Sequence, residues 1–418
     1  MTSTEVEPEP VMVPPPARRR RLWLWLSVAV VVTVLTAGGF VAFMLNRPVP
    51  APRVVQTVPQ MYAIPGGAPV LPWPQAGQAA LEVDGLGRLG GSGGSRPVPI
   101  ASVAKVMTAY IILRDHPLRL NEDGPTLTVT AAEAAAYPAQ LAGGESLIPV
   151  TAGEELTERQ ALQALLLPSA NNIAHILARW DAGSDAAFVA EMNQAATQLG
   201  MANTHYTDPA GLDPATVSTA ADQVILAHAA MQLPVLAQIV AMPQATLPGV
   251  GPVKNVNSQL GKDGMIGIKT GSTDQAGGCL LFAAEITVEG QRLRILGAVL
   301  APGPNMADAF DASRHLIQAV TGLLHKYQVV RAGEVVATVQ GPRNRSTALA
   351  AAGDVNVLGW PGLTYRVETP TAVPGRIAAG AGVGALTLTA SDTTVTGALH
   401  ATNALRPPSR WERIAYRR

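Results

Sequence analysis

A serine and a lysine lie three residues apart at the start of an apolar run, in Pro99-Ile-Ala-Ser102-Val-Ala-Lys105-Val-Met-Thr-Ala109. On a helix this spacing puts both side chains on one face, so the amine of Lys105 can reach the hydroxyl of Ser102. A serine whose proton is taken by a neighbouring base is a nucleophile for acyl transfer. The helix predicted from Ser102 to Arg114 also leaves N–H groups of its first turn without intrahelical partners, a suitable setting for a developing oxyanion.

Lysine is rare in this chain, and two of its lysines lie in candidate catalytic motifs. The sequence has 25 arginines and five lysines, which are Lys105, Lys254, Lys262, Lys269 and Lys326. An arginine does not give up its proton in a protein, whereas a buried lysine can lose it and act as a base. A lysine beside a serine therefore suits a role that an arginine could not fill.

Two further short motifs follow the serine–lysine pair in the chain. Ser169-Ala-Asn171 comes after a helix predicted over residues 154–167. It would supply a hydroxyl for proton relay and an amide to hold a substrate backbone; an ordinary polar loop between helices is the alternative. Lys269-Thr270-Gly271 ends a predicted strand, where a cation and a hydroxyl suit a substrate carboxylate. The glycine would let a ligand approach the backbone closely.

The N-terminal part of the chain predicts a membrane anchor. Residues 1–21 are acidic, then proline-rich, and end in four arginines, which predicts a disordered cytoplasmic tail. The next segment, 22–45, is uncharged and long enough for a transmembrane helix. Arginines on its N-terminal side place that end in the cytoplasm and the rest of the chain outside. Thr36-Ala-Gly-Gly39 leaves cleavage possible.

Three more regions follow the predicted transmembrane helix. Residues 46–78 are rich in proline and predict an extended, semi-rigid tether. Residues 79–325 mix predicted helices and strands in a catalytic domain, and residues 326–418 have the short alternating segments of a separate β-rich domain. Within the catalytic domain, Gly85-Leu-Gly87-Arg-Leu-Gly90 follows a predicted strand. No helix follows it, so we interpret it as a hairpin loop and not as a dinucleotide site.

Composition gives no indication of a nucleic-acid partner, a disulfide or a metal site. The formal net charge is zero, which gives no indication of nucleic-acid binding. The single cysteine, Cys279, rules out an intrachain disulfide. The seven histidines show no metal-ligand spacing, so we expect no metal site and no cofactor.

Taken together and in this order, the three motifs resemble those of the serine-type D-Ala-D-Ala carboxypeptidases, the low-molecular-mass penicillin-binding proteins. Further segments resemble landmarks of that family, namely Phe188-Val-Ala-Glu-Met-Asn193, Asp208-Pro-Ala-Gly211-Leu212-Asp213 and Ala276-Gly277-Gly-Cys279. The resemblance covers roughly residues 79–324. The chain departs from the family pattern at Asn172, Ala210 and Ser272, which affects fine substrate preference.

The resemblance implies an α/β (α+β) fold. We expect an antiparallel sheet flanked by helices and a helical subdomain, with the small C-terminal β-rich domain and the N-terminal transmembrane helix added to it. The implied location is the bacterial cell membrane, with a single pass and the catalytic domain outside the cytoplasm.

The resemblance also implies a reaction and a role for each motif. Ser102 would attack the carbonyl between the terminal D-alanines of a peptidoglycan stem pentapeptide, and Lys105, in its neutral form, would accept the serine proton. Ser169 would relay a proton to the leaving amine. The remaining implied roles are substrate binding by Asn171, Lys269, Thr270 and Gly271, and an oxyanion hole made by the N–H groups of Ser102 and Ser272. β-Lactam antibiotics would acylate Ser102 and inhibit the enzyme.

Two alternatives remain open. A β-lactamase has the same three motifs but needs an added acidic residue between the second and third. Glu191 is the only glutamate in that interval, and it falls inside a helix predicted over residues 186–199. A non-catalytic wall-binding scaffold on the same fold is the other alternative, and the intact motif residues argue against it.

Overall fold

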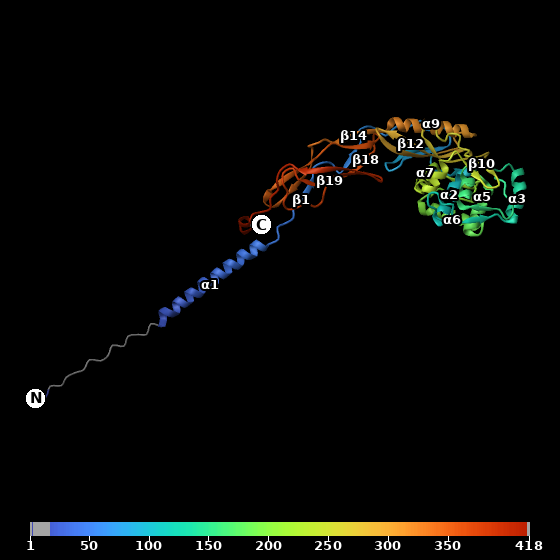
Figure 1. The fold of residues 1–418 in the computed structure, drawn as a ribbon. Coiled ribbons are helices and arrows are strands. Elements are labelled where there is room, and N and C mark those ends of the chain that lie inside the picture. Colours follow the sequence, from blue (N-terminus) through green and yellow to red (C-terminus); the bar gives the residue numbers. More distant parts are fainter. Residues whose placement is uncertain (1, 3–16, 416–418) are drawn as a thin grey trace.

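Helix α1 (Ala17–Asn46) extends away from the rest of the protein as a single rod (Figure 1). The computed structural model describes residue 2 and residues 17–415. From Arg21 to Asn46 the helix is long and apolar enough to cross a membrane, and its apolar stretch is not buried within the protein. Apolar side chains such as Trp23 and Leu35 are exposed all round it, as expected for a helix whose surroundings are themselves apolar.

The helix predicted over residues 22–45 is therefore present, but it begins earlier. Because α1 starts at Ala17, residues 17–21 of the predicted disordered tail are helical. The other residues of that tail, 1 and 3–16, lie outside the described residues.

A five-stranded antiparallel sheet lies at the centre of residues 78–323, with the strand order β11-β12-β13-β3-β4. Its strands are β3 (Gln78–Val83), β4 (Gly87–Ser92), β11 (Met265–Thr273), β12 (Gly277–Val288) and β13 (Gln291–Leu300). Alternate side chains enter two different cores, because successive residues of a strand point to opposite faces. Ala80 and Leu281 join one core, whereas Leu81 and Phe282 join the other. The β3–β4 hairpin, with Gly85 and Gly87 at positive φ, confirms the predicted hairpin loop.

Helices cover both faces of this sheet. Helix α9 (Met306–Leu323) packs in the core that contains Phe282. On the other face lie α7 (Ala220–Met231) and α2 (Lys105–Asp115), which follows the short 3-10 turn η1 (Ala101–Ala104). The helical subdomain around them contains α3 (Ala131–Ala142), α4 (Glu158–Leu166), α5 (Asn171–Ala182), α6 (Asp185–Leu199) and α8 (Pro234–Val240). Three short antiparallel ladders complete it, β5 (Val98–Pro99) with β8 (Val217–Ser218), β6 (Thr126–Thr128) with β7 (Glu155–Thr157), and β9 (Gln244–Leu247) with β10 (Gly251–Lys254).

The predicted fold class is confirmed, with local differences at the helices. Helix α4 begins at Glu158 and not at residue 154, because Glu155–Thr157 pair as strand β7. The capping box between Thr157 and Gln160 is present. Helix α3 has no counterpart among the predicted helices. None of its residues is buried, so no apolar stripe marks it in the sequence.

A second group of strands, which we name the β module, follows the central sheet. Its C-terminal strands are β14 (His325–Val330), β15 (Val335–Gln340), β16 (Ser346–Ala351), β17 (Val355–Gly359), β18 (Thr364–Glu368), β19 (Gly382–Ala390) and β20 (Thr393–Ala401). They are joined by β1 (Arg53–Gln56) and β2 (Met61–Ala63) in a seven-stranded sheet of order β1-β15-β16-β20-β19-β18-β2, and β14 pairs with β17. The β-rich C-terminal region is thus present as predicted.

The tether predicted over residues 46–78 is wrong in its central part, because β1 and β2 are the two edge strands of the β module. Arg53 pairs with Gln340 and Ala63 with Thr364, and Ile64 is buried immediately after β2. Edge strands can lie next to prolines because one side of their backbone needs no partner. The proline content of this segment therefore marks edge strands and turns, and not an extended spacer.

The C-terminal end of the described chain lies beside the β module, next to the point where α1 ends. Helix α10 (Arg410–Ile414) lies against the end of α1, where Nη1 of Arg413 donates a hydrogen bond of 3.0 Å to the carbonyl of Leu45. In Figure 1 the β module lies between α1 and the helices that surround α2.

Candidate active site

The structure brings the first two candidate residues into contact. Ser102 lies in η1 and Lys105 is the first residue of α2. Nζ of Lys105 is 2.7 Å from Oγ of Ser102. Ala101, which precedes the serine, has a left-handed backbone conformation with φ of 48°, which a non-glycine residue adopts only when its surroundings hold it there.

Lys105 is fully buried. Burial lowers its pKa well below the usual value, and the nearby Lys269 lowers it further, while the charges of Asp208 and Glu145 act in the opposite direction. A neutral Lys105 can act as a base at neutral pH.

The contacts of Lys105 also determine where its lone pair points. A neutral amine has two N–H bonds and one lone pair. Nζ lies 2.6 Å from Oδ1 of Asn171 and 3.0 Å from the carbonyl oxygen of Ala210, and both of these atoms only accept hydrogen bonds. They take the two N–H bonds, so the lone pair is left facing the Ser102 hydroxyl. The site is therefore arranged for transfer of the serine proton to Lys105.

The Ala210 carbonyl is a functional group that the sequence motifs do not reveal, because any residue has one. It lies in a loop tied together by Asp208, whose carboxylate accepts hydrogen bonds from the backbone N–H groups of residues 210–213. Gly211 has a φ of 74°, and a Cβ there would lie 2.0 Å from the carbonyl oxygen of Ala101. Only glycine fits, and the Asp-x-x-Gly pattern is the signal that marks this turn.

Ser169 and Asn171 lie at the start of α5. Asn171 is its first residue and is buried, with Nδ2 donating a hydrogen bond of 2.9 Å to Oε2 of Glu145. Ser169 is also buried and has φ of 67°. Its hydroxyl has no hydrogen-bond partner within the described part of the chain. Ser169 has a strained backbone and a free hydroxyl, and it lies two residues before Asn171, the hydrogen-bond partner of Lys105. These features suit a proton relay.

The third motif lies on β11, directly beside the serine. A Cβ at Gly271 would come within 2.9 Å of the backbone nitrogen of Ser102 and of the carbonyl oxygen of Ile100. Glycine therefore keeps open the space in front of that N–H group. Ser272, whose N–H is the other predicted oxyanion donor, is exposed one residue further along.

Lys269 and Thr270 are buried on the same strand. Nζ of Lys269 donates to the carbonyl of Thr270 at 2.9 Å, and no carboxylate pairs with it among the described residues. Burial lowers the pKa of Lys269 to about 7. A buried cation without a counter-ion is a suitable partner for a carboxylate brought by a ligand.

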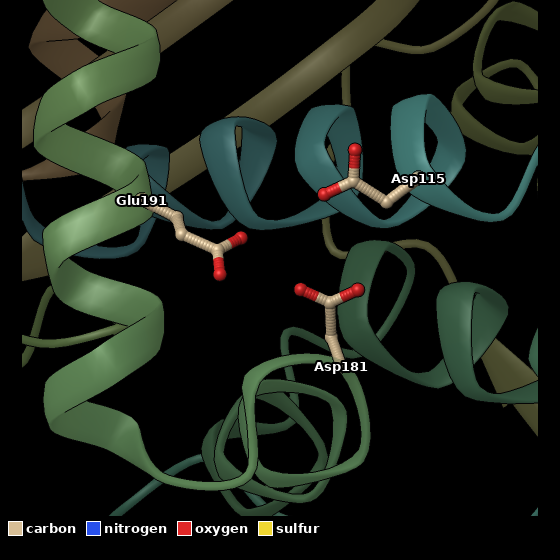
Figure 2. A group of neighbouring side chains, drawn as sticks. All are labelled: Asp115, Asp181 and Glu191. Carbon is tan, nitrogen blue, oxygen red and sulfur yellow. The ribbon is translucent and has the colours of Figure 1, made fainter.

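One carboxylate cluster lies elsewhere in the described structure. Asp115, Asp181 and Glu191 have oxygen atoms within 4.8 Å of one another (Figure 2). The cluster already has partners within the protein, because the Arg114 guanidinium pairs with Asp115 and Glu191, and the His116 ring lies 2.8 Å from Oδ1 of Asp181. Asp115 ends α2, and that helix of 11 residues separates it from Ser102 by on the order of 17 Å.

The position of Glu191 bears on the β-lactamase alternative. Glu191 lies on α6, and Figure 2 shows its carboxylate near those of Asp181 and Asp115, the last residue of α2. It is therefore too far from Ser102 to activate a water molecule for attack on an ester formed with the Ser102 hydroxyl. The expectation that the protein has no metal site or cofactor stays a prediction.

The site can thus perform nucleophilic acyl transfer, with a serine nucleophile and a neutral lysine base. A family model described as D-alanyl-D-alanine carboxypeptidase matches residues 92–300. D-alanyl-D-alanine endopeptidase of Pseudomonas aeruginosa is 34% identical over 56% of this chain and 76% of its own length. D-alanyl-D-alanine carboxypeptidase DacB2 of Mycobacterium tuberculosis is 35% identical over 58% of this chain and 82% of its own length.

Solved structures agree with these relatives. A point mutant of the Streptomyces K15 DD-transpeptidase, 27% identical, superposes with a TM-score of 0.52 over 60% of this chain and 98% of its own. Penicillin binding protein 5 of Haemophilus influenzae, 21% identical, shares the fold over 82% of this chain and 99% of its own, with a TM-score of 0.56. The chain belongs to the D-alanyl-D-alanine carboxypeptidase family. It is a serine-type carboxypeptidase, and the predicted family, fold class and enzyme class are confirmed.

Proposed function

We propose that this enzyme removes the terminal D-alanine from peptidoglycan stem pentapeptides through an acyl-enzyme on Ser102. One observation carries the proposal most directly, the 2.7 Å contact between Ser102 Oγ and a buried Lys105 whose other neighbours are acceptors. Relatives named as carboxypeptidases and endopeptidases of D-alanyl-D-alanine bonds support the substrate class.

Acylation begins with the hydroxyl of Ser102. Its proton passes to Lys105 as Oγ attacks the carbonyl carbon between the two D-alanines, and the oxyanion is held by the N–H groups of Ser102 and Ser272. The carbon–nitrogen bond then breaks. The leaving amine of D-alanine takes up the proton held by Lys105, relayed through Ser169, so Lys105 is neutral again and an ester on Ser102 remains.

Deacylation returns the enzyme to its starting state. Water attacks the ester carbonyl as one of its protons passes to Lys105. The bond to Ser102 Oγ then breaks, and Lys105 passes that proton to Oγ as the shortened peptide leaves. In substrate binding, Lys269 and Thr270 hold the terminal carboxylate and Asn171 holds the peptide backbone. Gly271 lets the substrate approach the backbone of β11 closely. A β-lactam presents a strained amide at the same place and acylates Ser102, so we propose these antibiotics as covalent inhibitors.

We also propose a location for this chemistry. Helix α1 anchors the chain in the bacterial cell membrane with a single pass, and the arginines before it keep that end in the cytoplasm. The catalytic domain, from β3 to α9, then lies outside with its peptidoglycan substrate. The β module, including β1 and β2, forms a separate domain next to the membrane.

The test uses the full chain in detergent micelles. Wild type is incubated with an acyl-D-Ala-D-Ala peptide and, separately, with penicillin, and released D-alanine and protein mass are followed. We expect D-alanine release and a long-lived penicillin adduct, both lost in Ser102→Ala and both kept in Ser258→Ala, a change at an exposed serine.

Two results would contradict this proposal. If folded wild type released no D-alanine and formed no adduct, the scaffold alternative would be favoured. An adduct that hydrolysed within milliseconds would instead favour a β-lactamase.

A further inference from the structure

The loop from Gly143 to Val150 is fastened to the start of α5 beside the base. The backbone N–H of Asn171 donates to the carbonyl of Ser146 at 2.7 Å. Nδ2 of Asn172 donates to the carbonyl of Ile148 at 2.8 Å, and the N–H of Ile148 donates back to Oδ1 of Asn172 at 3.4 Å. These three hydrogen bonds hold the loop without any help from the side chain of Glu145.

Glu145 makes a contact of a different kind. Its carboxylate oxygen Oε2 accepts a hydrogen bond from Nδ2 of Asn171 at 2.9 Å, while Oδ1 of the same amide accepts from Lys105. An ionised carboxylate can only accept hydrogen bonds, whereas an amide presents a donor on one side and an acceptor on the other. Glu145 therefore selects one of the two orientations of the Asn171 amide.

The other orientation would disable the base. If the amide of Asn171 turned over, its NH₂ group would face Lys105 and would compete for the amine lone pair. One N–H bond of Lys105 would then lack an acceptor, and the Ser102 hydroxyl would have no lone pair to receive its proton. Glu145 would meet an amide oxygen, an unfavourable contact between two acceptors.

We propose that Glu145 is a positioning residue for the general base, whose carboxylate fixes the Asn171 amide and thereby directs the lone pair of Lys105 at Ser102. The inference rests on the proposed function of Ser102 and Lys105. Glu145 lies between the Ser102–Lys105 motif and the Ser169–Asn171 motif and belongs to neither of them.

The charge of Glu145 gives the proposal a second, separable consequence. Burial lowers the pKa of Lys105, and the negative charge of Glu145 opposes that shift together with Asp208. Without this charge the pKa of Lys105 falls further. Lys105 is then protonated only at a lower pH, so the acidic limb of the pH–rate profile moves to lower pH.

Two variants separate orientation from charge. Glu145→Gln removes the charge but keeps an oxygen that can accept from Asn171. Glu145→Ala removes both the charge and the acceptor. Glu155→Gln is the matched control, because Glu155 is an exposed carboxylate ten residues further along the chain, on strand β7.

The experiment measures the rate of acylation by penicillin against pH for the full chain in detergent micelles, with thermal unfolding as a check of folding. We expect Glu145→Ala to lower the plateau rate by about 10- to 100-fold, the usual effect of misplacing a catalytic group. Glu145→Gln should lower the plateau less than the alanine change does and move the acidic limb to lower pH. Direct titration of Lys105 by NMR of ¹³C-labelled lysine, with only five lysines to resolve, should show the same downward shift.

Each result has a definite consequence for the proposal. A plateau and an acidic limb in both Glu145 variants that match Glu155→Gln would overturn it. So would normal acylation followed by a trapped ester, because that result would make Glu145 the base that activates water. If wild type and Glu155→Gln formed no adduct, the proposed function itself would fail, and the inference with it.

Discussion

The active site and the β module bury different kinds of group. The site buries two lysines, Lys105 on α2 and Lys269 on β11, together with Asn171 and Ser169. The β module buries mainly apolar side chains, such as Leu386. Burying a polar or charged group lowers stability unless it is fully paired, whereas apolar burial stabilises by roughly 25 cal/mol per Å². The site therefore gives up stability for reactivity, whereas the apolar core of the β module stabilises the fold.

This difference predicts opposite outcomes for changes in the two regions. A substitution in the site should change the rate of acyl transfer without the loss in free energy of unfolding that a large-to-small change in an apolar core causes. A substitution in the core of the β module should change the free energy of unfolding and leave the rate unchanged.

The largest effect is expected from Lys105→Arg. Arginine remains protonated, so it cannot accept the Ser102 proton, and acylation by penicillin should fall by about 10³-fold, within the range typical of general-base loss. The measurement is the rate at which the penicillin adduct appears by mass. Lys105→Met, of similar length and without charge, should lose a comparable factor, and Lys254→Arg on β10 is the exposed control. Activity within tenfold of wild type in both Lys105 variants would show that another group takes the proton.

A smaller effect, on stability alone, is expected from Ile64→Ala. Ile64 is 1% exposed and donates its N–H to the carbonyl of Leu363 at 2.8 Å. Removing its buried methyl groups should lower the free energy of unfolding by about 3 kcal/mol, with D-alanine release unchanged. Denaturant titration and the release assay measure the two quantities side by side.

The control for this change is Met61→Ala, because Met61 is exposed on β2. Equal stability of the two variants would show that residues 53–64 are a loose tether after all. A parallel loss of activity in Ile64→Ala would show that the two regions are coupled, which would break the comparison.

The same two regions show what the sequence can reveal. Ser102 and Lys105 lie within one helical turn, so their contact follows from local geometry, and the short Ser169–Asn171 and Lys269–Gly271 motifs are recognisable for the same reason. The pairing of Arg53 with Gln340 joins residues 287 positions apart. Nothing local marks such a pairing, and the prolines around it favour the wrong interpretation.

Within the site, the groups that the sequence does not reveal fall into two kinds. The carbonyl of Ala210 is a backbone group and carries no residue-type signal. Glu145 lies between the first and second motifs, and its contact with Asn171 depends on how the loop after α3 folds back onto α5. Side-chain chemistry at fixed spacing could be predicted, whereas contacts made by tertiary folding could not.

The smallest effect concerns Lys269 and tests whether a buried charge has a functional purpose. With a pKa of about 7, Lys269 is protonated below that pH and neutral above it. Because only the protonated form attracts a carboxylate, affinity for a peptide ending in a free carboxylate should fall as the pH rises from 7 to 8.5, by roughly tenfold. A peptide with an amide in place of that carboxylate should show no such fall. Calorimetry with Ser102→Ala, which binds without turnover, measures both affinities.

The control is Lys269→Arg, which stays charged and should flatten the pH dependence of the affinity. Equal dependence of affinity on pH for the two peptides would show that the buried charge serves another purpose.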